Sequence, residues 1–168
     1  MRNRDRDRDR DRDAAGRARN ARPRDEAGRP LPRGAVGVER VPDDLVLPPE
    51  ETVQEAQRLL DAGQPFHAHE VLEAAWKAAD AGERELWRGL AQVAVGLTHL
   101  QRGNARGAVA LLQRGAGNVT RWRVGWLGPV PAGLDVDDVV RRAEELASRI
   151  EREGPDAATP DDLRPRLR

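Results

Sequence analysis

The chain has 168 residues, of which 35% are charged and only 3% are aromatic, so its hydrophobic core must be small. Its formal net charge is zero, which argues against nucleic-acid binding by bulk electrostatics, and the lack of cysteine excludes disulfides, thiolate nucleophiles and cysteine-ligated zinc. The most apolar run is too short to span a bilayer and no apolar stretch resembles a signal peptide, so we expect a cytoplasmic protein without membrane contact.

The N-terminal part of the chain is highly charged. Residues 2–13 almost strictly alternate Arg and Asp, and the residues that follow, up to about position 40, are rich in Arg, Pro and Gly. Such segments bury too little apolar surface to offset the entropy lost on ordering. We therefore predict a disordered tail over 1–42, a folded domain over 43–153 and a second disordered tail over 154–168, with a partner-binding role as the alternative for the first tail.

The first two predicted helices form a hairpin. A helix begins at Pro49, where two glutamates follow and favour the positive end of the helix dipole, and Gly63 ends it. Pro65 then begins a second helix, which extends to about Asp80. Apolar residues recur at helical spacing in the first of these segments, so this face is predicted to pack inward.

Three further helices complete the prediction. The segment 85–102 is apolar nearly all round, which is typical of a helix at the centre of its domain. A fourth helix follows from position 105, and the segment 121–133, "RWRVGWLGPVPAG", is predicted to be irregular. Asp135 is placed to cap the last helix, which extends to about position 150.

An internal repeat connects the two hairpins. The segment "LLDAGQPFHAHEVL" at 59–72 aligns with "HLQRGNARGAVALL" at 99–112, an offset of 40 residues. Each copy reads as helix, glycine-containing turn and helix, a pairing that is similar to a tetratricopeptide unit. The predicted fold is therefore all-α: a compact bundle of two helix-turn-helix hairpins plus a C-terminal helix, flanked by the two tails.

Charge is unevenly distributed between the hairpins. Residues 86–134 carry six arginines and no acidic residue, whereas the first hairpin is rich in acids. This asymmetry fits simple attraction between two packed halves, and it also fits an anion-binding surface. For the second interpretation the candidate anion-binding residues are Arg102 and Arg106.

The segment "FHAHEVLEAAW" at 66–76 places ionisable groups beside an apolar helix face. His69 and Glu73 are four residues apart, so an imidazole nitrogen and a carboxylate oxygen can reach a single ion, and Trp76 lies on the same side. Glu70 lies on the outer side of Glu73, and His67 is expected to point towards solvent.

Two ligands do not complete a metal site, and the best additional donor is on the third helix. His99 and, one heptad earlier, Gln92 share a face of that helix, so His69, Glu73, Gln92 and His99 are predicted to converge between the first three helices. Imidazole and carboxylate ligands suit Zn, Mn, Fe or Ni. The alternative is that the same polar groups form a buried hydrogen-bond network with a purely structural role.

The stretch from "FHAHEVLEAAWKAA" to "GLAQVAVGLTHLQRGNARGAVALLQRG" resembles the family called domain of unknown function 309, over about residues 50–140. That family is marked by the motif H-x-x-x-E-x-x-W/Y, matched here by His69, Glu73 and Trp76. The resemblance implies an all-helical domain and a metal role suspected for the motif, without an established activity or substrate.

Two functions from different classes follow from these patterns. The first is a divalent-metal-binding pocket, and the second is a helical protein-interaction module whose polar cluster is structural. No nucleophile, base or phosphate-binding loop completes a catalytic set, so no catalytic residue is predicted. The interaction module would need a protein partner or a second copy of the chain in a homodimer.

Overall fold

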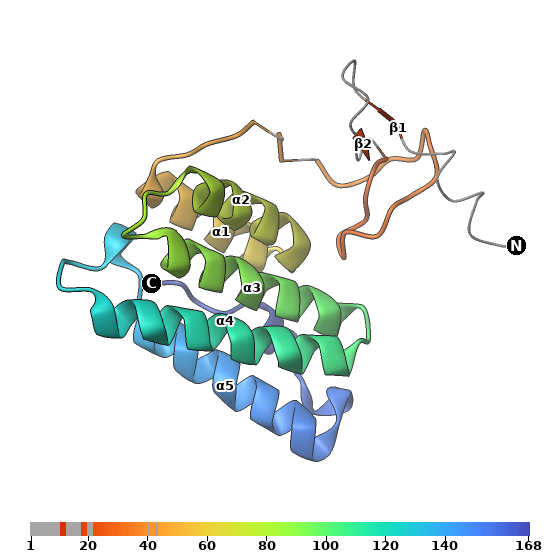
Figure 1. The fold of residues 1–168 in the computed structure, drawn as a ribbon. Helices are drawn as coiled ribbons and strands as arrows, with labels where there is room; N and C mark the ends of the chain where they lie inside the picture. Colours follow the sequence, from red (N-terminus) through yellow and green to blue (C-terminus); the bar gives the residue numbers. More distant parts are fainter. Residues whose placement is uncertain (1–10, 13–17, 20–21, 40, 43) are drawn as a thin grey trace, which may run out of the picture.

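The computed structural model describes residues 11–12, 18–19, 22–39, 41–42 and 44–168. Most of the Arg–Asp repeat lies outside these residues, whereas more than half of the predicted N-terminal tail, 1–42, lies within them. Two short strands, β1 (Asp11–Arg12) and β2 (Ala18–Arg19), pair antiparallel, with Asp11 opposite Arg19. They lie away from the helical bundle (Figure 1).

The remaining regular elements of the described chain are helices, which confirms the all-α prediction (Figure 1). Helices α1 and α2 form the first hairpin, α3 and α4 form the second, and α5 packs on α4. The α-helices are α1 (Pro49–Asp61), α2 (Pro65–Ala78), α3 (Arg84–Gln101), α4 (Ala105–Gly125) and α5 (Val136–Glu153). The 3-10 helices are η1 (Pro131–Gly133), η2 (Pro155–Ala157) and η3 (Pro160–Leu163).

Local chemistry explains where these helices begin and end. The two interhelical turns use Gly63 and Gly103, whose φ angles of 71° and 75° are in the left-handed region that glycine adopts without steric strain. Asn104 caps α4 by accepting a hydrogen bond from the amide three residues on, at 2.9 Å. Asp135 caps α5 in the same way at 3.0 Å, which confirms the predicted cap.

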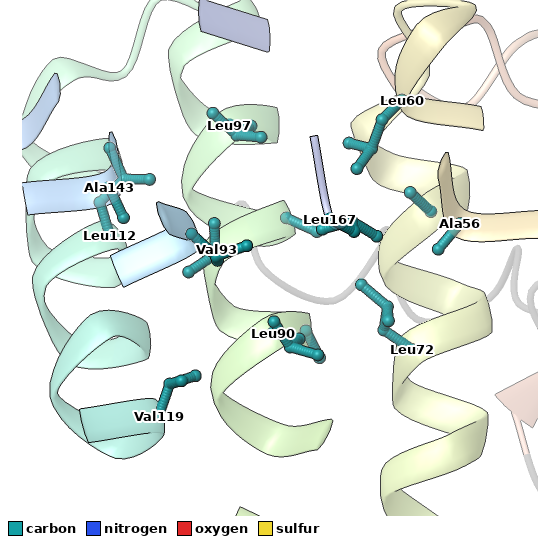
Figure 2. Packing of buried hydrophobic residues seen from close by; sticks show 14 of the residues in the cluster. Ala56, Leu60, Leu72, Leu90, Val93, Leu97, Leu112, Val119, Ala143 and Leu167 are labelled. Atoms are coloured by element: carbon teal, nitrogen blue, oxygen red, sulfur yellow. The ribbon is translucent and has the colours of Figure 1, made fainter. Parts of the chain in front are cut away.

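Helix α3 lies at the centre of the bundle, as its apolar composition predicted. Leu90 and Leu97 of α3 are each 2% exposed, and they lie between α4 and the first hairpin (Figure 2). The two glycines of α3 face α4: a Cβ atom on Gly89 would lie 2.6 Å from Val119, and one on Gly96 would lie 2.9 Å from Leu112. Small residues therefore allow α3 and α4, not α2 and α3, to approach closely.

Helix α4 is longer than predicted, because the first residues of the supposedly irregular segment 121–133 are helical up to Gly125. Trp122 is 7% exposed and donates its indole N–H to the carbonyl of Gly82 at 2.8 Å. Its ring stacks on Trp126, with 5.3 Å between centroids. The buried indole offsets the cost of extending the helix, and no glycine or proline occurs between Arg121 and Gly125.

Residues 22–38 lie against the start of α2 and the end of α3. Gly28 packs so closely on the Phe66 ring that a Cβ atom there would lie 2.0 Å from the ring carbon Cγ. The carbonyl of Ala27 accepts a hydrogen bond from Arg102 Nε at 2.8 Å. We call residues 22–38 the N-terminal flank. It contacts the helices through backbone carbonyls, Gly28 and the Arg24 side chain, none of which produces a hydrophobic periodicity in the sequence.

The segment 154–168, predicted as a disordered tail, lies against α1, α3 and α5 in the structure. Leu167 is 3% exposed and lies between α1 and α3 (Figure 2). Its amide donates to Gln57 Oε1, and its carbonyl accepts from the amide of Asp135, both at 2.8 Å. A single buried leucine among charged residues carries no periodic signal, which is why the sequence did not predict this contact.

None of the described helices is long and apolar enough to cross a membrane.

Candidate functional site

The candidate site lies on the first three turns of α2. His69 Nε2 is 3.2 Å from Glu73 Oε2, so the pair predicted from the four-residue spacing does form. His69 Nδ1 is 3.0 Å from the carbonyl oxygen of Phe66, and Glu73 Oε1 is 2.9 Å from Lys77 Nζ. The His69 and Glu73 side chains are 19% and 33% exposed, so both are accessible from solvent at the edge of the core.

These contacts restrict the protonation state of His69. Since the Phe66 carbonyl can only accept, Nδ1 must carry the proton in that hydrogen bond. Nε2 then either carries a second proton and donates to Glu73, or it directs a lone pair to the same point as the carboxylate. The hydrogen bond from His69 lowers the pKa of Glu73 to about 2; partial burial opposes this shift, and Lys77 adds to it.

His67 is buried, so the prediction that it points to solvent was wrong. Its side chain is 1% exposed; Nδ1 is 3.3 Å from Glu70 Oε2, and Nε2 is 3.2 Å from the backbone carbonyl of Asp25. The N-terminal flank supplies that carbonyl and covers this side of α2. Glu70 is therefore a hydrogen-bond partner of His67, not of His69.

The two donors expected from α3 lie elsewhere. Gln92 Oε1 accepts a hydrogen bond from Asn118 of α4 at 2.6 Å, and His99 Nδ1 is 3.0 Å from Asn104 Nδ2 in the turn between α3 and α4. Across the described ranges, no group of three or more His, Asp or Glu side chains is arranged to hold a metal ion. The structure thus brings together His69 and Glu73, but it does not bring Gln92 or His99 to them.

A small hollow lies beside the pair. Glu70, Glu73 and Lys77 line it together with Ala74, and two residues that precede α1, Val41 and Pro42, close one side; its volume is about 120 Å³. Both carboxylates of α2 therefore border the same space.

Trp76, the third residue of the motif, lies against α3. It is half-buried at the edge of the core, with the Arg88 guanidinium carbon 5.8 Å from its ring centroid. Its place in the motif is explained by packing between α2 and α3.

The predicted anion-binding arginines are in separate environments. Arg102 donates to Ala27, and its guanidinium carbon lies 5.3 Å from the Phe66 ring centroid, with Arg24 at 4.8 Å from the same ring. Burial lowers the pKa of Arg102, and the nearby charges of Arg24 and Arg29 lower it further. Arg106, in contrast, is exposed at the start of α4. The role of Phe66 was not predicted, because its partners are remote in sequence: Arg24 and Gly28 in the N-terminal flank, and Arg102 at the end of α3.

Comparison with known proteins gives one match. Residues 53–111 match the model of a family described as "Domain of unknown function (DUF309)". This segment extends from α1 into α4 and includes His69, Glu73 and Trp76. Neither a curated protein nor a solved structure matches the chain.

Proposed function

We propose, from the match of residues 53–111 to the DUF309 family model and from the geometry of α2, that the domain binds a divalent transition metal ion through His69 and Glu73. The observation that carries the proposal is the hydrogen bond between His69 Nδ1 and the Phe66 carbonyl. Metal-binding histidines commonly donate one ring N–H to a carbonyl, which orients the other nitrogen as the ligand. Here that nitrogen faces the Glu73 carboxylate.

The spacing of the two donor atoms fits a metal ion. Zinc binds imidazole nitrogen and carboxylate oxygen at about 2.0–2.2 Å, so two tetrahedral ligands are about 3.3 Å apart. His69 Nε2 and Glu73 Oε2 are 3.2 Å apart. The pair can therefore bind one ion after the loss of the Nε2 proton and without a change of rotamer. Imidazole and carboxylate donors suit Zn, Mn, Fe or Ni.

Glu70 is the best candidate for a further ligand. Its carboxylate borders the same hollow as Glu73, and a rotation away from His67 would release it. Lys77 acts in the opposite direction, because its ammonium group competes with a cation for Glu73 Oε1. A metal held there would supply a Lewis acid that polarises a bound water or carbonyl. Water would fill the coordination positions that these side chains leave open.

The test measures the melting temperature of the full chain with and without added Zn or Mn. A ligand that binds only the folded state raises the melting temperature, by an amount that depends on its concentration relative to its dissociation constant. The variant Glu73→Gln keeps the shape of the side chain but removes its charge, so it should abolish most of the rise. Glu55→Gln is the matched control, because Glu55 has a similar side-chain exposure of 31% and pairs with Arg58 but has no histidine partner.

A metal-dependent rise in wild type and Glu55→Gln, but not in Glu73→Gln, supports the proposal, and elemental analysis of purified protein gives the identity of the metal. A wild type whose melting temperature does not respond to the metals overturns the proposal and identifies the pair as structural.

A further inference from the structure

The outer seam between α4 and α5 is hollowed at both ends. One hollow, of about 530 Å³, has a floor of Val119, Val136 and Val140. The other, of about 340 Å³, lies between Val109 of α4 and Ile150 of α5. Exposed apolar side chains gather at the first end, where Val124 is 81% exposed and Leu127 is fully exposed. A face with this much uncovered apolar surface is typical of an interaction site.

Charge is separated across this seam. Every charged residue of α4 is an arginine, whereas α5 carries a row of acids, Asp137, Glu144 and Glu151, each one heptad from the next. Arg123 lines the same hollow as Asp137 and Glu144, and Arg106 lines the same hollow as Glu151. With the other described residues, these five side chains form no ion pair. One edge of the seam is therefore basic and the other is acidic, at matched levels along the helices; Arg141 also lines the first hollow from α5, but it is paired with Asp138 and Glu145 of its own helix.

We propose that this seam is a homodimer interface whose occupant is a second copy of the chain. The two-fold axis runs parallel to the seam, so α4 of each copy lies over α5 of the other. Because α4 and α5 of one chain are antiparallel, the end of α4 that carries Arg123 then meets the start of the partner's α5, and Arg106 meets the end of the partner's α5. Each contact occurs twice, as two-fold symmetry requires.

The distances along the helices agree with this arrangement. Arg106 and Arg123 are about 26 Å apart along α4, and Asp137 and Glu151 are about 21 Å apart along α5, at 1.5 Å per residue. Side chains of arginine and glutamate easily cover the difference. A two-fold axis across the helices would instead place the basic α4 over a second α4, where like charges repel. Charge complementarity therefore selects one orientation.

The size of the face sets the expected affinity. Two helices of about 27–31 Å in length and about 10 Å in width present roughly 550 Å² of projected surface per copy. This is below the roughly 800 Å² per partner of a standard stable interface, so we expect a dissociation constant in the micromolar range. The measurement must therefore cover about 1–200 μM protein.

Sedimentation equilibrium on the full chain tests the proposal through a charge swap. Arg106→Glu places a glutamate opposite Glu151 of the partner, and Glu151→Arg places an arginine opposite Arg106 of the partner. Each variant alone should weaken the dimer at least tenfold, and an equimolar mixture should recover wild-type affinity, because the heterodimer restores opposite charges at both contacts. Both substitutions suit their own helix, since an acid at the start and a base at the end favour the helix dipole.

Arg84→Glu is the matched control, since it makes the same change at the start of α3, away from the seam; it should leave the dimer unchanged. Recovery in the mixture also shows that both variants are folded. The proposal is overturned by a wild type that stays monomeric over this range, by a dimer that survives Arg106→Glu, or by a mixture that does not recover. The metal site lies on α2, so none of these outcomes affects the metal-binding test.

Discussion

The close approach of α3 and α4 predicts opposite effects for two glycines of one helix. A Cβ atom on Gly115 would lie 2.7 Å from the carbonyl oxygen of Gly89 and 2.8 Å from both the amide nitrogen and a methyl group of Val93. On Gly117 the nearest atom would be a guanidinium nitrogen of Arg121 at 3.6 Å, which is ordinary contact. Both glycines are inside α4, so alanine gains the same helix propensity at each position.

The expected magnitudes follow from these distances. Gly117→Ala should stabilise the protein by about 0.5–1 kcal/mol, the usual difference in helix propensity between glycine and alanine. Gly115→Ala gains the same amount, but backbone atoms of α3 cannot move aside as a flexible side chain would, so we expect a net loss of about 1–3 kcal/mol. At about 2–4 °C per kcal/mol for a chain of this size, the two variants should melt several degrees apart, one above and one below the wild type.

Thermal melts followed by circular dichroism, together with urea unfolding, measure both variants under the same conditions. Gly117→Ala leaves the contacts between α3 and α4 unchanged, so it measures the gain in helix propensity without the steric effect expected at Gly115. If Gly115→Ala is as stable as Gly117→Ala, the two helices do not pack at the distance described, and the centre of the fold has been misplaced.

Two further predictions concern the edges of the core. Leu167→Ala should lower the free energy of unfolding by about 2–4 kcal/mol, because a fully buried leucine leaves a cavity; an effect below about 0.5 kcal/mol in urea unfolding would place Leu167 in solvent. The Glu73 carboxylate contributes stability above its ordinary pKa of 4.5, and this contribution is lost as the pH falls towards about 2. The unscreened shift is worth roughly 3 kcal/mol, but a third of the side chain is exposed, so we expect about 1 kcal/mol. Glu73→Gln should remove this pH dependence from the urea midpoint, and an unchanged pH dependence would contradict the assignment.

Local signals in the sequence predicted most of the fold. These signals are the proline and acids at Pro49, the glycine turns and the cap at Asp135. Each acts within a few residues, so it can be recognised in one sequence without knowledge of the tertiary contacts. The length of α4 was not predicted, because the anchor at Trp122 depends on Gly82, forty residues earlier in the chain. The docking of Leu167 was missed for the same reason, since its partner Gln57 is remote in sequence.

In the candidate site, too, contacts within one helix were predicted and contacts between remote segments were not. His69 and Glu73 belong to one helix, so their contact follows from helix geometry alone. Gln92 and His99 were predicted to face α2 because they share one face of α3. Which neighbour that face meets depends on tertiary packing, and the glycines of α3 pack against α4. His67 was misjudged because the group that buries it, the carbonyl of Asp25, has no side-chain signature.

The indole of Trp122 also determines how the domain comes apart. In a linear array of helical repeats each unit contacts only its neighbours, and hairpins can open one at a time. Here the hydrogen bond from Trp122 to Gly82 connects the end of α4 to the turn between α2 and α3, and the buried indole packs at this junction. Separating the end of α4 from the start of α3 exposes this ring and breaks its bond. We therefore expect slow amide hydrogen exchange to be shared by α3 and α4 as one cooperative unit, and the outer turns of α1 and α5 to exchange through smaller openings.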